Sequence, residues 1–257
     1  MPTEEILMNN YIKSEKAKNP ALIVMKRELK SYFTSPIGYI VTGLFLILCG
    51  ILFYSTFYLL NRADLRQLFG NFPLLLSFFV PALTMRSFAE EKRSGSIETL
   101  FTLPVTEVQV TTGKYLASLI ATLIMIAPTL FYIIPAEIFG SPDYGPIIGG
   151  FLGTILLAAS YTSIGIFATS VTKNQIVAFF TGFIICIVLT MIDSFLIFLP
   201  ASIVTFLNFI SANSHFTSIA RGIIDSRDII YFISLTALFF VITVKIQQQA
   251  KTSVTGV

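Results

Sequence analysis

Six long apolar segments are the feature that most restricts how this chain can fold. They cover residues 37–60, 68–84, 115–139, 147–170, 176–199 and 229–244. A helix needs about 20 residues to cross the hydrocarbon core of a bilayer, which is about 30 Å thick. The segments are continuously apolar and lack the alternation of barrel strands. The sequence therefore predicts an all-α integral membrane protein with a six-helix transmembrane bundle over residues 37–247. The second and sixth spans are the shortest.

The composition excludes an ordinary soluble protein. Only 12% of the residues are charged and the mean hydropathy is +0.81, whereas soluble domains carry about 25% charged residues. The formal net charge of +3 is not a concentrated basic face, so we expect no nucleic-acid partner. Cys49 and Cys186 both lie inside apolar segments, which predicts neither a disulfide framework nor a metal site.

Basic residues are distributed unevenly between the two sides of the predicted bundle. With the N-terminus inside, the cytoplasmic side receives Lys13, Lys16, Lys18, Lys26, Arg27, Lys30, Arg86, Lys92, Arg93, Lys114, Lys173, Lys245 and Lys251. The other side receives Arg62, Arg66, Arg221 and Arg227. By the positive-inside rule, the chain is predicted to cross the inner (cytoplasmic) membrane of the cell several times with both termini in the cytoplasm.

Two polar tails and one amphipathic segment flank these spans. Residues 1–19 and 248–257 are expected to be cytoplasmic tails. Between the first tail and the first span, residues 20–36 place four apolar side chains at helical spacing opposite a basic face: Leu22, Met25, Leu29 and Tyr32. This pattern predicts an amphipathic connecting helix in the membrane interface. The alternative is a solvated segment that carries positive-inside charges.

Two connections are too long to be simple turns. The coupling loop, residues 86–114, is charged and then has Ile97, Leu100 and Phe101 on one helical face before Pro104. It predicts a short helix beneath the bundle. On the other side, residues 200–228 contain two apolar helical patterns around a polar turn. They predict a short extracytoplasmic helical hairpin.

Few residues in the chain suggest catalysis. His215 is the single histidine, which leaves no multi-histidine metal site, and there is no GxxxxGK[ST] phosphate loop. Glu137 and Asp193 are the ionisable residues inside the spans. We expect Asp193 either to line a translocation path or a dimer interface, or to reach the outer interface. An ion-driven carrier normally has several ionisable groups at mid-membrane, so energy for transport is expected to come from outside the chain.

Three stretches resemble a known family. They are residues 25–36, residues 90–105 together with Gly113-Lys114, and residues 221–232. The first is similar to a connecting helix that runs into the first span, and the second to a coupling-helix signature. The third is similar to the segment before the last span in the gliding-motility branch. The chain thus resembles the permease subunit of type-2 ABC transporters, particularly the branch that includes the gliding-motility permease.

The resemblance implies a half-transporter that exports its substrate, forms a homodimer or heterodimer, and sits on two separate ABC ATPase subunits in the lipid membrane. ATP and Mg would be bound by those partners, with no cofactor and no catalytic residue in this chain. It also implies that Glu90, Glu91, Arg93 and Glu98 face the ATPase and that Gly95 allows a turn or a close approach. The alternative is that these charges form the solvated face of a helix. A scaffold protein, a secondary carrier and an intramembrane enzyme are the competing functions.

Overall fold

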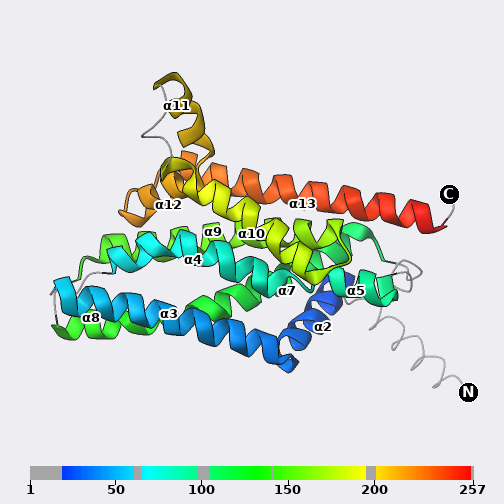
Figure 1. Ribbon diagram of the computed structural model, residues 1–257, viewed down its shortest axis with the longest axis horizontal. Coiled ribbons are helices and arrows are strands. Elements are labelled where there is room, and N and C mark those ends of the chain that lie inside the picture. Colours follow the sequence, from blue (N-terminus) through cyan, green and yellow to red (C-terminus); the bar gives the residue numbers. More distant parts are fainter. Residues whose placement is uncertain (1–18, 61–64, 98–104, 140–141, 195–200, 256–257) are drawn as a thin grey trace, which may run out of the picture.

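The computed structural model describes residues 19–60, 65–97, 105–139, 142–194 and 201–255. These residues are almost entirely helical and include no strand (Figure 1). Six of their helical stretches are long and apolar enough to cross a membrane. The predicted all-α membrane bundle is therefore confirmed.

The described helices lie between residues 20 and 255. In chain order they are α2 (Pro20–Thr34), α3 (Pro36–Leu60), α4 (Arg66–Thr84), α5 (Ala89–Ser94), α7 (Glu107–Ile126), the 3-10 helix η1 (Ala127–Tyr132), α8 (Ile133–Phe139), α9 (Tyr144–Val171), α10 (Gln175–Met191), α11 (Ala201–Ile210), α12 (Ala212–Ala220) and α13 (Ser226–Thr255). The third span consists of α7, η1 and α8. Pro128 lies in the first turn of η1, where the α-helix tightens.

The two ends of the bundle carry different short helices. In Figure 1, α2, α5 and the C-terminal end of α13 lie at one end, and α8, α11 and α12 lie at the other. Ser211 separates α11 from α12 and caps α12 by accepting a hydrogen bond from the Ser214 N–H. The hairpin predicted over residues 200–228 is thus two consecutive short helices.

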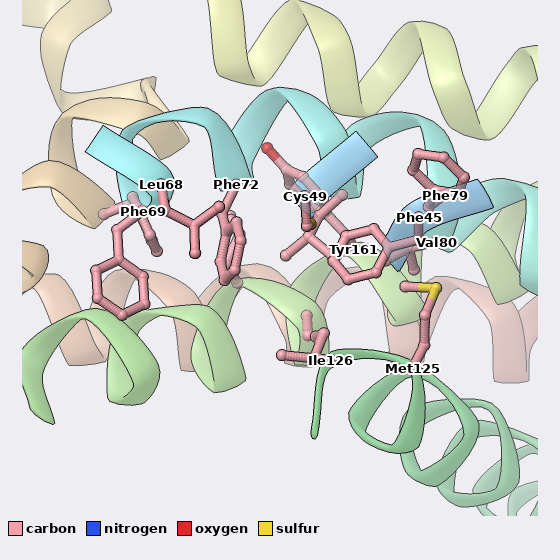
Figure 2. Packing of buried hydrophobic residues seen from close by; sticks show 14 of the residues in the cluster. Phe45, Cys49, Leu68, Phe69, Phe72, Phe79, Val80, Met125, Ile126 and Tyr161 are labelled. Atoms are coloured by element: carbon pink, nitrogen blue, oxygen red, sulfur yellow. The ribbon is translucent and has the colours of Figure 1, made fainter. Parts of the chain in front are cut away.

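Helices α4 and α9 form the centre of the bundle. Most residues of both are buried, whereas only about a fifth of the residues in the spans of α3, α10 and α13 are buried. Aromatic side chains from α3 and α4 meet in this core (Figure 2), with Phe45 and Phe79 packed edge to face at 5.4 Å between ring centroids. Tyr161 of α9 is fully buried in the same cluster. Aromatic packing therefore holds the central helices together.

Small residues let α9 approach its neighbours closely. A Cβ at Gly149 would lie 2.2 Å from the backbone oxygen of Ile219 in α12. A Cβ at Gly150 would lie 2.4 Å from the ring of Phe69 in α4. Close backbone approach at small residues is typical of membrane helices. The glycines of α9 therefore set the position of α12 against the core.

Two helices extend beyond the predicted spans. The third span begins at Glu107, well before residue 115, because Thr106 and Gln109 form a capping box there. The coupling loop is correspondingly shorter than residues 86–114. Residues 248–255, predicted as a tail, continue α13 to Thr255, and Lys251 donates a hydrogen bond to Glu107 of α7 at 2.7 Å. The predicted tail over residues 1–19 lies, apart from Asn19, outside the described residues, as do Leu100 and Phe101.

The contact at Gly149 leads to a prediction. We expect Gly149→Ala to lower the thermal unfolding midpoint of the detergent-solubilised protein by several degrees. The added methyl group would displace a backbone carbonyl, and overpacking typically costs about 1–3 kcal/mol.

Gly70→Ala is the matched control, because a Cβ at Gly70 meets no atom within 4 Å. Alanine is favoured over glycine in a helix by about 1 kcal/mol, so this variant should be at least as stable as the wild type. Equal stability of the two variants would contradict the proposed packing of α9 on α12.

Candidate functional site

A fully buried lysine lies where α2, α5 and α7 meet. The side chain of Lys114 in α7 is 0% exposed, and its Nζ donates hydrogen bonds to Glu28 Oε1 at 3.0 Å and to the Ser87 backbone oxygen at 2.8 Å. The same Nζ lies 3.0 Å from Glu91 Oε1. The ring of Phe88 lies below it, 4.9 Å from Nζ to the ring centroid. The carboxylates of Glu28 and Glu91 therefore neutralise a cation that is fully buried.

Arg27 of α2 completes this group of charges. Its Nη2 donates to Glu91 Oε1 at 2.8 Å and to Glu28 Oε1 at 3.0 Å. We call Arg27, Glu28, Glu91 and Lys114 the charge cluster. Burial lowers the pKa of Arg27, but its hydrogen bonds and attraction to Glu28 and Glu91 outweigh this effect, so the pKa is raised overall. Two cations and two carboxylates thus link three helices.

Close packing of α2 on α7 holds the charge cluster in place. A Cβ at Gly113 would lie 2.6 Å from the backbone oxygen of Ala21 and 2.8 Å from the Cβ of Val24. Further along, the hydroxyls of Tyr32 and Ser118 are hydrogen-bonded at 2.8 Å. Burial raises the pKa of Tyr32, and the hydrogen bond to Ser118 only partly offsets this. The helix predicted over residues 20–36 therefore packs along the bundle through one face, while Leu22 and Ile23 remain exposed.

The residues predicted to face an ATPase separate into two groups. Glu90 and Arg93 of α5 are exposed, and so is Gly95, which ends α5 with a left-handed φ of 74°. Glu91 points the other way, into the charge cluster. Glu98 lies outside the described residues. The structure thus leaves Glu90, Arg93 and Gly95 accessible and places Glu91 inside the chain.

Lys92 fixes α5 against the neighbouring span. Its Nζ donates a hydrogen bond to the backbone oxygen of Ser170, near the end of α9. Carboxylates occupy the first turn of α5 and basic residues its last turn, which suits the helix dipole. One short helix is therefore anchored on one side to α2 and α7 and on another to α9.

Sequence reasoning missed the central role of Lys114. It was assigned to the end of the cytoplasmic loop, because the third apolar segment was taken to begin at residue 115. The signal that could have corrected this is the T-x-x-Q capping pattern of Thr106 and Gln109, which begins a helix two turns before Lys114. No sequence pattern pairs Lys114 with Glu28, which is 86 residues away.

Asp193 lies near the opposite end of the bundle. Its Oδ2 accepts a hydrogen bond from Asn213 Nδ2 of α12 at 2.6 Å. Nearby in the sequence, His215 Nδ1 is 2.6 Å from Asp228 Oδ1, and the His215 ring stacks on Tyr231 at 4.2 Å. These contacts join α10, α12 and α13. A role for Asp193 in a translocation path or a dimer interface stays a prediction.

The described residues offer no catalytic metal centre, since no group of three His, Cys, Asp or Glu side chains among them could hold an ion. What the α2–α5 end presents instead is a short exposed helix, ionically tied to two other helices of a six-span bundle.

The family comparison decides between the competing functions. A family described as "ABC-2 family transporter protein" matches residues 4–246, nearly the whole chain. The chain belongs to the ABC-2 transporter family. It is therefore the permease component of an ABC transporter, as the resemblance implied. No curated protein matches the chain, and the gliding-motility branch stays a prediction.

The charge cluster of this ABC-2 permease leads to a second prediction. We expect Lys114→Met to destabilise the purified protein strongly, because it leaves Glu28 and Glu91 without their buried cation. Removing one partner of a buried ion pair costs about 3–5 kcal/mol. The measurement is the unfolding midpoint in detergent, together with the yield of folded protein.

Lys30→Met is the matched control, since Lys30 is exposed on α2. That variant should unfold within a degree or two of the wild type. If Lys114→Met is as stable as Lys30→Met, the charge cluster does not hold α2, α5 and α7 together.

Proposed function

We propose that this permease is the membrane subunit of an ATP-driven exporter, that two copies or two related permeases form its membrane part, and that separate ATPase subunits dock on α5. The observation that carries the proposal is that α5 has one exposed side and one side that is ion-paired to the bundle. Its exposed side offers Glu90, Arg93 and Gly95, while Glu91 on its inner side is ion-paired to α2 and α7. A helix with these two sides suits the transmission of movement.

The charge cluster provides the mechanical link. When a partner shifts α5, Glu91 moves against Lys114 and Arg27, and the shift reaches α7 and α2 together. Helix α7 is the first part of the third span and packs against α9. Such a displacement changes the balance between inward-facing and outward-facing states only if the ATPase contacts the two states differently.

The source of energy lies in the partner. An ion-driven carrier needs ionisable groups along its path, but Lys114, the fully buried cation of the third span, is committed to Glu28 and Glu91. ATP and Mg are accordingly assigned to the ATPase subunits. Movement of the ATPase subunits would open this permease first to one side of the membrane and then to the other.

Dimerisation is supported by the unequal burial of the spans. Helices α3, α10 and α13 bury few of their residues and expose several large apolar side chains, among them Ile47, Ile184 and Leu238. Lipid covers such surfaces, and a second permease can cover part of them. The distribution of basic residues supports an orientation in the inner membrane with α2, α5 and both termini on the cytoplasmic side.

A charge reversal on α5 tests the docking surface. We expect Arg93→Glu to reduce the amount of ABC ATPase that co-purifies with a C-terminally tagged permease by about tenfold, which corresponds to about 1.4 kcal/mol. Arg93 is exposed, so the variant should fold normally. Co-purified ATPase is measured by mass spectrometry and vanadate-sensitive ATP hydrolysis.

Arg221→Glu is the matched control, because Arg221 is exposed next to α12 at the opposite end. It should retain the partner fully. If no ATPase co-purifies with the wild type from cells that express the neighbouring genes, the ATP-driven proposal fails and a carrier or scaffold function replaces it. Equal retention by both variants would show that α5 is not the docking surface.

A further inference from the structure

A cavity opens between α2, the beginning of α3 and α5. Its volume is about 350 Å³, at the lower end of the range for small-ligand sites. It lies where α2 ends at Ser35 and the first span begins at Pro36. Its lining combines charged, hydroxyl and apolar side chains, among them Arg27, Tyr32, Leu83, Arg86, Ser87 and Glu91. Such a lining suits a polar ligand that also has an apolar part.

Two oppositely charged side chains in this lining each keep a buried atom without a hydrogen-bond partner among the described residues. Arg86 donates from Nη1 to Ser35 Oγ at 2.9 Å, but its Nε has no acceptor. Glu91 accepts through Oε1 from Arg27, but its Oε2 has no donor. Buried polar atoms are usually hydrogen-bonded, so each such atom requires an explanation.

Ser87 adds a third group of this kind. Its side chain lines the cavity, the residue is only 5% exposed, and its Oγ is buried without a hydrogen-bond partner in the part of the chain that the structure describes. The residues that line the cavity therefore hold two donors without an acceptor, at Arg86 and Ser87, and one anionic acceptor without a donor, at Glu91. A ligand that satisfies all three needs an anionic group and a cationic N–H group a short distance apart.

We infer that this cavity binds the headgroup of a phospholipid with a primary ammonium group, as in phosphatidylethanolamine. The phosphate accepts hydrogen bonds from Arg86 Nε and Ser87 Oγ. The ammonium donates to Glu91 Oε2, with Glu90 at the exposed side of the cavity. Charge-assisted hydrogen bonds of this kind are the strong ones in proteins.

The balance of charge selects a zwitterion over an anion. Three carboxylates line the cavity, at Glu28, Glu90 and Glu91, against the guanidinium groups of Arg27 and Arg86. Lys114 also pairs with Glu28 and Glu91, so the charges around the cavity nearly cancel, and a purely anionic headgroup would add a negative charge without a counterpart. A choline headgroup has the phosphate but no N–H, so it cannot donate to Glu91 and leaves Oε2 unsatisfied, which is costly for a buried charged group.

The position of the cavity favours a membrane lipid over a soluble phosphate compound. The exposed side chains of Phe33, Tyr39 and Ile40 lie around the junction of α2 and α3. The span that begins there continues with an apolar exposed face along which acyl chains can pack. Placing the lipid in the cytoplasmic leaflet rests on the proposed orientation, but its binding requires neither that orientation nor an ATPase.

Binding would connect the turn after α4 to α5, and through the hydrogen bond from Arg86 to Ser35 it would also reach the end of α2. The headgroup would bridge Arg86 and Ser87, in the turn after α4, to Glu91 of the charge cluster. We therefore expect this lipid to stabilise the arrangement of α2 and α5.

Native mass spectrometry of the full-length permease tests the proposal. The protein is equilibrated with equal amounts of phosphatidylethanolamine, its N-methyl and N,N-dimethyl derivatives, phosphatidylcholine and phosphatidylglycerol in mild detergent. We expect retention to fall as N–H donors are removed, with phosphatidylethanolamine retained about tenfold more than phosphatidylcholine, and with little phosphatidylglycerol. Equal retention of phosphatidylethanolamine and phosphatidylcholine would overturn the proposal.

Two variants locate the site. Arg86→Gln should lower phosphatidylethanolamine retention about tenfold, since a hydrogen bond to a charged group is lost. Ser87→Ala is a smaller change and should lower phosphatidylethanolamine retention by about threefold. It still tests the site if Arg86→Gln fails to fold. Lys30→Gln is the control, because Lys30 is exposed on α2 but does not line the cavity.

If both cavity variants retain as much phosphatidylethanolamine as the wild type, the lipid does not bind in this cavity. Soluble glycerophosphoethanolamine distinguishes the source of the headgroup. If it competes as tightly as the lipid, the assignment to a membrane lipid is wrong.

Discussion

Burial of the Lys114 ammonium group is the constraint on which the α2–α5 end of this permease depends. A lone cation in this position would be costly, and two carboxylates from different helices make it tolerable. Glu28 places α2, and Glu91 places α5, against the same atom of α7. Displacing either helix would remove one of the two carboxylates that pair with the buried charge. It therefore holds the helix proposed to meet the ATPase in a defined position relative to the bundle.

Two kinds of packing serve different purposes along the molecule. In the middle, α4 and α9 are joined by aromatic rings and by glycines that allow close approach, which makes a rigid centre. At the end with α5, charged groups and a cavity lie between the helices. Ion pairs and a lipid headgroup can rearrange over short distances, whereas a packed core cannot. The end of the bundle that is proposed to receive movement is thus the end whose contacts can rearrange.

Much of the fold could be predicted from the sequence because the bilayer imposes a simple rule on length and hydropathy. The spans at α3, α4 and α9 begin and end close to their predicted positions. The span at α10 begins where predicted, and its predicted end lies beyond Ser194, outside the described residues. The rule fails where helices extend beyond the apolar core. Glu107 begins α7 and Lys251 lies in α13. Both are polar, and their contact with each other allows the two helices to continue.

For the candidate site, the sequence by itself determined that residues 90–95 form a charged, turn-ended segment, since charge and glycine position are local properties. It also placed the chain among type-2 permeases through motifs of contiguous residues. Only the tertiary structure decided that Glu91 faces inward while Glu90 and Arg93 face outward. The same holds for Lys114, a residue that the sequence assigned to solvent. The physical reason is that burial and pairing of a charge depend on partners from distant parts of the chain, which meet only when the helices pack.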